Sequence, residues 1–372
     1  MPKYKSLSTT RPYDPYKFLG QEKVFLSTII IGFTLAAFFA GSGAPAMWLG
    51  FFFAAYAAVA NDSIQSLGTF IESNGHRKWW VLWLYIGAIF LAVISFSWWY
   101  FDGDVTYQRL LSDDGVTKYP HPESFSFFQI IAPLVLIILT RLRMPVSTTF
   151  LLLSVFSADT SGITSVVLKS WSGYAMAFIL SFAVWYFSYK TIRKYFKSRK
   201  HNQSWVVVQW IVSGALWATW IMQDGANIAV FLPRQQSPLQ FAIFAVVIFA
   251  GLGLLFYMRG DKIQRIVSEK VRISDVRAAT LVDFTYVLLL IYKLFISTVP
   301  MSTTWVFLGI IGGREIAVSL ARKKSGAKHK KRAIIMTLRD FGYAMAGLVI
   351  SVLLAAGANP DIRNKVLETI GF

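Results

Sequence analysis

Two short runs of hydroxyl side chains are the residues best suited to bind a small ligand. Pro-Val-Ser-Thr-Thr occupies residues 145–149, Pro-Met-Ser-Thr-Thr occupies residues 300–304, and each opens an apolar stretch. Proline suits the first turn of a helix, whose free backbone N–H groups and dipole make that end positive. Two such ends facing each other would form a cage of donors for a tetrahedral oxyanion. The cage would comprise Ser147, Thr148, Thr149, Ser302, Thr303 and Thr304. Ordinary helix capping is the alternative.

A second repeated element contains asparagine. Ala-Asn-Asp at 60–62 precedes the first Ser-Thr-Thr and Ala-Asn-Ile at 226–228 the second, so that the asparagines lie 166 positions apart and the serines 155. Polar residues embedded between apolar segments are costly and usually functional. We expect Asn61, Asp62 and Asn227 to line the anion site. The same three residues and Gln65 are candidate ligands for Na⁺, and Asp62 is alternatively a proton carrier.

A simpler reading is that Asn61-Asp62 begins a cytoplasmic loop. The small, apolar run 66–71 favours re-entry into the membrane instead.

Composition indicates a membrane protein. The chain is 55% hydrophobic and 15% charged, with a mean hydropathy of +0.51, whereas soluble domains carry about 25% charge. Uncharged runs such as 81–100 and 241–258 approach the ~20 residues that cross a bilayer. These runs are continuous rather than alternating, which favours helices over a barrel. The polar, basic N-terminus predicts no removable signal peptide, and the absence of cysteine excludes disulfides.

The expected fold is an all-α polytopic membrane protein with about 11–12 transmembrane segments in two inverted repeats. Eleven apolar segments lie near residues 24–43, 46–60, 79–100, 125–140, 145–158, 172–190, 205–222, 239–258, 280–298, 302–320 and 335–357. Segments 46–60 and 145–158 are short for full crossings and are expected to be half-helices.

The expected organisation follows from these segments. It is a cytoplasmic segment 1–23, a first inverted repeat 24–170, a connecting helix with a basic cytoplasmic segment 171–201, a second inverted repeat 202–320, and a basic loop with a final transmembrane helix 321–372.

Lysine and arginine predict the orientation. With the N-terminus inside, the inner segments hold 28 of the 37 Lys and Arg residues, a strong positive-inside bias. We therefore expect an integral protein of the plasma (inner) membrane with a cytoplasmic N-terminus and an outer C-terminus. Anionic lipid then explains the net charge of +18 without nucleic acid. The acidic loop 102–123 is expected to be a solvated outer loop.

This topology gives the two copies opposite orientations. Asn61 and Pro145 fall on the inner side, whereas Asn227 and Pro300 fall on the outer side. Inverted repeats with broken helices around a central site are typical of secondary transporters.

The motifs resemble those of a known family. Ala-Asn-Asp-Ser-Ile-Gln-Ser-Leu-Gly-Thr at 60–69 is similar to the Ala-Asn-Asp-x-x-Asn-x-x-Gly-Thr signature of the inorganic phosphate transporter (PiT) family, the phosphate/sulfate permeases. Asp-Gly-Ala-Asn at 224–227 resembles its second copy, Gly-Ala-Asn-Asp, and both Pro-x-Ser-Thr-Thr phrases resemble its Pro-Val-Ser-Thr-Thr-His pair. The resemblance spans about residues 45–320. It implies a homodimer that imports phosphate, or in some members sulfate, with Na⁺ or H⁺. It places the anion on the Ser-Thr-Thr helix ends and the cation near the Asn-Asp sequences.

The chain departs from the family pattern at four positions. Ile228 stands where the family has its second Asp, and Gln65 replaces an Asn of the first signature. Phe150 and Trp305 replace the His after each Ser-Thr-Thr. One carboxylate of the usual pair is thus missing, and Asp224 replaces it only if a loop is rearranged. The coupling ion and its stoichiometry stay open.

Phosphate is the favoured substrate. Hydrogen phosphate carries an O–H that needs an acceptor, whereas sulfate carries none, so a carboxylate such as Asp62 favours phosphate. A sulfate permease, an uncoupled anion channel and a non-transporting relative are the alternatives. An enzyme is not expected, since GxSxG, HExxH and P-loop motifs are absent, and no cofactor beyond a bound Na⁺ is implied. Asp283 and Lys293 lie about 15 Å apart on one helix, too far to pair.

Overall fold

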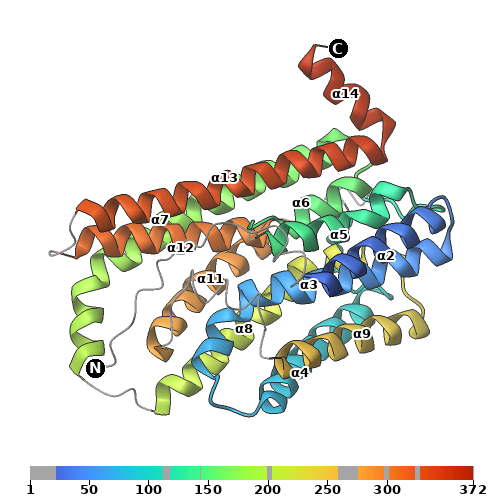
Figure 1. Ribbon diagram of the computed structural model, residues 1–372. Coiled ribbons are helices and arrows are strands. Elements are labelled where there is room, and N and C mark those ends of the chain that lie inside the picture. Colours follow the sequence, from blue (N-terminus) through green and yellow to red (C-terminus); the bar gives the residue numbers. More distant parts are fainter. Residues whose placement is uncertain are drawn as a thin grey trace.

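The computed structural model describes residues 22–111, 118–142, 144–198, 203–258, 275–296, 301–322 and 327–371, which form helices and connecting turns (Figure 1). The helices are α2 (Lys23–Phe39), α3 (Ala44–Ser73), α4 (Trp79–Tyr100), α5 (Phe127–Arg141), α6 (Thr148–Leu153) with the 3-10 turn η1 (Ser154–Phe156), α7 (Thr160–Ser198), α8 (Gln203–Ala229), α9 (Pro238–Tyr257), α11 (Val276–Ile296), α12 (Thr303–Ala321), α13 (Ala327–Ala358) and α14 (Pro360–Ile370).

The helices confirm a polytopic all-α membrane fold. Eight of those described are long and apolar enough to cross a membrane, and α2 and α5 are shorter apolar helices. Each of the eleven predicted segments falls on a helix. The polar helix α14 was not predicted, and it projects from the end of α13 (Figure 1). The basic segments at 1–21, 199–202, 259–274 and 323–326, like Arg143 and Pro300, lie outside the described residues.

One expectation about the first half is wrong. Segment 46–60 is not a half-helix, because α3 continues without interruption from Ala44 to Ser73. Asn61-Asp62 therefore begins no loop, and the run 66–71 is the next part of the same helix rather than a re-entrant segment. Side chains on the later turns of α3 are largely buried against neighbouring helices, which supplies the packing that a separate loop would lack.

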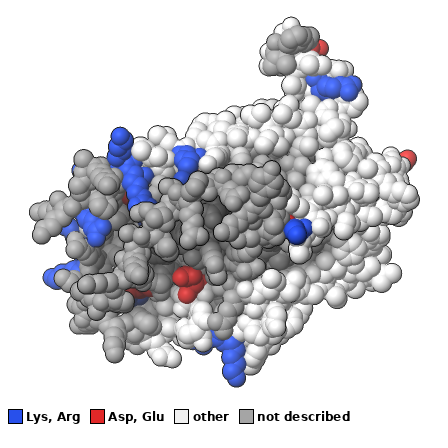
Figure 2. Space-filling view, in the orientation of Figure 1, with Lys and Arg blue, Asp and Glu red and all other residues white. Residues whose placement is uncertain are grey.

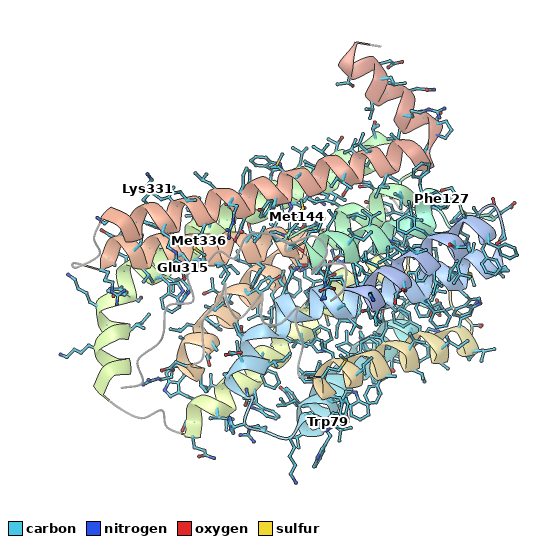
Figure 3. The ribbon with its side chains drawn as sticks, in the orientation of Figure 1. Trp79, Phe127, Met144, Glu315, Lys331 and Met336 are labelled. Carbon is cyan, nitrogen blue, oxygen red and sulfur yellow. The ribbon has the colours of Figure 1, made fainter. Side chains whose placement is uncertain are left out.

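The second expected half-helix is confirmed. Helix α6 has only 6 residues and passes directly into η1. Met144, just before α6, lies near the middle of the molecule, whereas Phe127 at the start of α5 and Lys331 near the start of α13 lie toward opposite ends (Figure 3). The short helix therefore begins inside the helix bundle, and the first Ser-Thr-Thr run lies at that buried start.

Corresponding helices of the two halves run antiparallel. Asn74, just past the end of α3, bonds to Gln209 near the start of α8, while Gly50 near the start of α3 packs against Phe231, just past the end of α8. Helices α4 and α9 show the same relation, since the Trp83 indole bonds to the Phe249 carbonyl and Trp98 stacks on Phe241. Antiparallel pairing of corresponding elements is the arrangement of an inverted repeat.

Contacts between these helices have counterparts between the corresponding helices of the other half. Helix α4 packs on α8 as α9 packs on α3, and α5 packs on α3 as α11 packs on α8. Likewise α6 contacts α8 while α12 contacts α3. The predicted repeat boundaries stay predictions, and the boundary between 170 and 171 falls inside the continuous helix α7.

The outer surface agrees with a lipid environment. Among the described residues in view, uncharged side chains predominate, and several Lys and Arg lie toward the end where α13 begins (Figure 2). Large apolar side chains such as Phe295, Phe187 and Phe38 are exposed on several helices. Exposed apolar faces of this extent on a polytopic helical protein are those expected to face lipid.

The 102–123 loop is not simply solvated. In its described part Val105, Thr106 and Arg109 are buried, and the Val105 carbonyl approaches Gly225 of α8. The Asp104 carboxylate accepts hydrogen bonds from the backbone N–H groups of Thr106 (2.7 Å) and Gln108 (2.7 Å). Burial raises the pKa of Asp104, and these bonds oppose the rise.

Strain is concentrated in the same segment. Tyr107 and Gln108 have backbone φ angles of 54° and 58°, a region that residues other than glycine rarely adopt. Such a conformation persists only where its surroundings fix it, and here burial and the hydrogen bonds to Asp104 do so. The segment packs on α8 at Gly225, next to Asp224.

Candidate functional site

The first half of the site is built on α3 and α6. The Asp62 carboxylate accepts a hydrogen bond from the Thr148 hydroxyl (2.6 Å) and one from the Asn61 amide (2.7 Å). The Asn61 carbonyl oxygen accepts from Thr140 of α5 (3.2 Å). Asp62 is only 2% exposed. The sequence pair Asn61-Asp62 and the first Ser-Thr-Thr, 86 positions apart, are thus brought into direct contact.

The second half repeats this chemistry with different spacing. The Asp224 carboxylate accepts from the Thr149 hydroxyl (3.0 Å) and from the Asn227 amide (2.8 Å). Asn227 also donates to Thr149 (3.2 Å). The side chain of Thr303 also lies close to the Asp224 carboxyl group. Asp224, 1% exposed, is therefore the second carboxyl group of the site.

The position of Asp224 corrects the sequence interpretation. No loop rearrangement is needed, because residues 224–229 belong to the continuous helix α8. Ile228, four residues after Asp224, lines an apolar pocket with Phe90, Trp217 and Ile248. The carboxyl group at 224, one helical turn before Ile228, is the one that lies in the site. The spacing of four residues between 224 and 228, which brings both near one helix face, was a signal that could have found Asp224.

Both serines act as helix caps. Ser147 Oγ accepts from the backbone N–H of Phe150 (3.1 Å), and Ser302 Oγ accepts from that of Trp305 (3.2 Å). The ordinary capping role is therefore real at both ends. It occupies an acceptor lone pair of each serine and leaves its hydroxyl hydrogen available.

The two helix starts lie against each other. The rings of Phe150 and Trp305, which follow the two Ser-Thr-Thr runs, meet edge to face with centroids 5.4 Å apart. Thr149 from α6 and Thr303 from α12 both reach Asp224. All six hydroxyl residues of the two runs are buried. The predicted convergence of the two runs is thus present in the tertiary structure.

Three buried acceptor atoms of this site have no hydrogen-bond partner among the described residues. They are Asp62 Oδ2, Asp224 Oδ2 and Asn227 Oδ1. A buried oxygen without a donor is costly, and a buried carboxylate is more so unless a counter-charge offsets it, as Arg109 partly does for Asp224. These atoms therefore mark a place that favours a cation or a proton.

The remaining predicted residue is more remote. Gln65 donates to the Asn61 carbonyl at 3.4 Å and is only partly buried. It therefore orients Asn61 rather than adding an unused oxygen to the centre.

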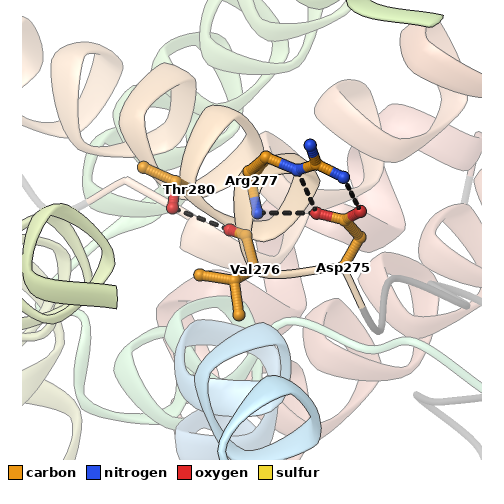
Figure 4. Close-up of polar contacts among 4 residues, drawn as sticks. All are labelled: Asp275, Val276, Arg277 and Thr280. Atoms are coloured by element: carbon orange, nitrogen blue, oxygen red, sulfur yellow. Dashed lines mark hydrogen bonds and ion pairs between the residues drawn. The ribbon is translucent and has the colours of Figure 1, made fainter. Parts of the chain in front are cut away.

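Helix α11 adds a residue that the sequence did not single out. The Tyr286 hydroxyl donates to the carbonyl oxygen of Thr303 (2.8 Å), and Tyr286 lies within electrostatic range of both Asp62 and Asp224. No motif contained it, because only packing brings it to the site. The start of α11 is anchored by Arg277, whose guanidinium binds both carboxylate oxygens of Asp275 (3.0 and 2.8 Å; Figure 4). This pairing holds the pKa of Asp275 below its usual value.

Comparisons with protein-family models, with curated proteins and with solved structures found no match for this chain. The geometry of the site is therefore the basis for assigning a function.

Proposed function

We propose that this protein is a secondary active transporter that imports inorganic phosphate together with a cation, Na⁺ or H⁺. The observation that carries the proposal is the pair of buried carboxyl groups, Asp62 and Asp224. Both accept hydrogen bonds from hydroxyls of the first Ser-Thr-Thr run, and Thr303 of the second run lies close to Asp224. The membrane fold is compatible with this function. The resemblance of the motifs to the PiT family supports it.

Electrostatics links the anion to a cation. An anion placed beside two carboxylates in a low-dielectric interior would be repelled strongly. Cations or protons on Asp62 and Asp224 remove that repulsion, and their unpartnered oxygens are free to receive them. Binding of the anion then requires prior loading of the cation, which is the basis of symport. An uncoupled channel would not need the carboxyl pair.

The same carboxyl groups favour phosphate over sulfate. Where Na⁺ offsets its charge, the carboxylate still accepts the O–H of hydrogen phosphate, whereas sulfate has no proton to donate and leaves that acceptor unpaired. With Asp224 present, the site has two such acceptors rather than one. Hydroxyls of Thr148, Thr149 and Thr303 supply donors for the remaining phosphate oxygens once they leave the carboxylates.

The membrane location, the orientation and the oligomeric state are part of the same proposal. We place the protein in the plasma (inner) membrane as a homodimer, with the N-terminus cytoplasmic and the C-terminus outside. Its partners are phosphate, the coupling cation and lipid, without nucleic acid and without catalysis of a reaction.

Uptake measurements test the proposal directly. The purified protein is placed in liposomes, and uptake of radiolabelled phosphate and sulfate is followed under imposed Na⁺ or H⁺ gradients. We expect gradient-driven phosphate uptake, lost in Asp62→Asn and in the double variant Thr149→Val/Thr303→Val. The exposed Asp361→Asn on α14 is the control and should transport normally.

Three results would overturn the proposal. Gradient-driven uptake of sulfate alone would reassign the substrate. Uptake of phosphate without any gradient effect would indicate a channel. Absence of uptake of both anions by the wild-type protein would indicate a non-transporting relative.

A further inference from the structure

A third buried carboxyl group lies outside the site described above. Asp283, in the middle of α11, is 2% exposed. Its Oδ1 accepts a hydrogen bond from Thr69 of α3 (2.6 Å), and its Oδ2 accepts one from Ser213 of α8 (2.6 Å). Three helices from both halves of the chain thus meet at one acidic side chain. Neither the resemblance nor the repeated motifs include it.

The surroundings of Asp283 are neutral. Helix α11 packs on α3, α7, α8 and α12. The described charged side chains on these helices and on α11 are Asp62, Glu72, Lys169, Lys190, Lys194, Asp224, Arg277, Lys293, Arg314 and Glu315. Within the described residues, none of them acts on Asp283, whose interacting groups are the two hydroxyls. Lys293, on the same helix, bonds instead to Ser172 of α7 (2.7 Å).

A neutral setting favours a proton over a metal cation. A carboxylate buried without a counter-charge is unstable, and binding a proton removes its charge without any further ligand. Both oxygens of Asp283 already have close hydroxyl partners, and a cation between these oxygens would have to push them apart. Asp62 and Asp224 differ, because each keeps one oxygen without a partner.

A series of polar side chains connects Asp283 to one end of the bundle. Ser73 lies one turn after Thr69 on α3 and donates to its carbonyl oxygen (2.7 Å). The amide of Gln209, one turn before Ser213 on α8, bonds to Ser73 and to Asn74. Asn74 begins the turn that leads to α4, the end of α3 that the basic residues predict to be cytoplasmic.

Helix α11 also connects Asp283 to the anion site. Tyr286 lies three residues further along, about 4.5 Å along the helix axis, and its hydroxyl donates to the Thr303 carbonyl. A change in the packing around Asp283 therefore reaches the start of α12 through a single helix.

We propose that Asp283, held by Thr69 and Ser213, is a separate proton-binding site whose loading and release are coupled to anion transport. The proton comes from water at one face and returns to water at the other, with the carboxyl group alternating between its neutral and charged forms. This proposal rests on the proposed transport function for its coupling, although proton binding itself does not.

Infrared spectroscopy tests proton binding without transport. Wild-type and Asp283→Asn proteins in liposomes are titrated with pH, and the C=O band of protonated carboxyl groups is followed. We expect a band that titrates with pH and is missing in Asp283→Asn but present in the exposed control Asp361→Asn. If the two titrations are identical, Asp283 carries no proton there and is only a structural acceptor, which overturns the proposal.

Hydroxyl variants sharpen this test and guard against misfolding. Thr69→Val and Ser213→Ala each remove a donor that stabilises the charged form, so the midpoint of the Asp283 band should move to higher pH, by about one unit for each hydroxyl. Thr69→Ser keeps the hydroxyl and should restore the wild-type midpoint. A midpoint that does not respond to these changes would contradict the assignment of the band.

Proton flux tests the coupling. Liposomes containing a pH-sensitive dye report the protons that enter with each phosphate. We expect Asp283→Asn to lower this ratio by about one proton while phosphate still binds. An unchanged ratio would overturn the coupling, whereas absence of phosphate uptake in the wild-type protein would reject the proposed function and leave the infrared result valid.

Discussion

In the first half of the site the carboxyl group follows its asparagine, and in the second half it precedes it. Asp62 is one position after Asn61, whereas Asp224 is three positions before Asn227. An α-helix turns by about 100° per residue, so Asp62 lies ~100° around its helix from Asn61. Three residues back brings Asp224 to ~60° from Asn227 in the same sense. The two carboxyl groups thus differ in direction by only ~40°, and in height by about one turn. Both carboxyl groups therefore reach threonines of the same short helix, α6. The comparison shows that a helix face, rather than a sequence position, is what this site requires.

The helices that carry the two Ser-Thr-Thr runs also differ. Helix α6 has 6 residues and α12 has 19, so the two ends do not carry equal dipoles. In the first half the threonines provide the contacts to carboxyl groups, with Thr148 bonded to Asp62 and Thr149 to Asp224. The chemistry of the site is thus divided unevenly between the halves.

The largest expected effect tests whether both carboxyl groups are equivalent. Asp62→Asn and Asp224→Asn should each lower gradient-driven phosphate uptake by about 100-fold or more, because each removes a charge that the coupling cation neutralises. Uptake in proteoliposomes measures the effect. An Asp224→Asn protein with normal uptake would show that the second half does not take part in coupling.

The next effect tests why the carboxyl group sits at 224 rather than 228. Ile228→Asp should lower the free energy of unfolding by about 2–4 kcal/mol, because it buries a carboxyl group in the apolar pocket around Phe90 and Trp217. Thermal unfolding in detergent measures the change, with Ile228→Leu as the control that keeps the pocket apolar. Normal stability of Ile228→Asp would indicate that position 228 also faces the polar site.

A smaller effect compares the hydroxyl groups. Thr149→Val should raise the phosphate concentration for half-maximal uptake about tenfold, since it removes hydrogen bonds to Asp224 and Asn227. Thr149→Ser keeps the hydroxyl and should behave like the wild-type protein. If Thr304→Val in the second run has an equal effect, the threonines of the first run have no special role, which contradicts the uneven division between the halves.

A last effect, on stability alone, compares how closely two glycines pack against their neighbours. A Cβ at Gly313 of α12 would lie 2.3 Å from the Phe178 carbonyl oxygen of α7, whereas one at Gly347 of α13 would meet only the Val146 side chain. Gly313→Ala should therefore destabilise by about 1–3 kcal/mol and Gly347→Ala by less. Gly342, with no atom within 4 Å of an added Cβ, is the control, and its change to Ala should stabilise slightly. Thermal unfolding of the three variants checks this order.

Much of the architecture was readable from the sequence. Each predicted apolar segment falls on a helix, because ~20 continuous apolar residues have few stable forms other than a membrane helix. The short first Ser-Thr-Thr helix was also predicted. The break expected after residue 60 was wrong, because a polar Asn-Asp pair inside a helix and one at its end look alike until neighbours that satisfy it are known.

The sequence by itself determined the membrane class, the repeated motifs and the hydroxyl, amide and carboxyl groups available at the site. Tertiary structure alone decided which of them meet. It selected Asp224 in place of Ile228, brought Tyr286 to the Thr303 carbonyl, and gave Asp283 two hydroxyl partners from helices far apart in the chain. The physical reason is that local patterns set which face of a helix is polar, whereas packing between helices sets what that face contacts.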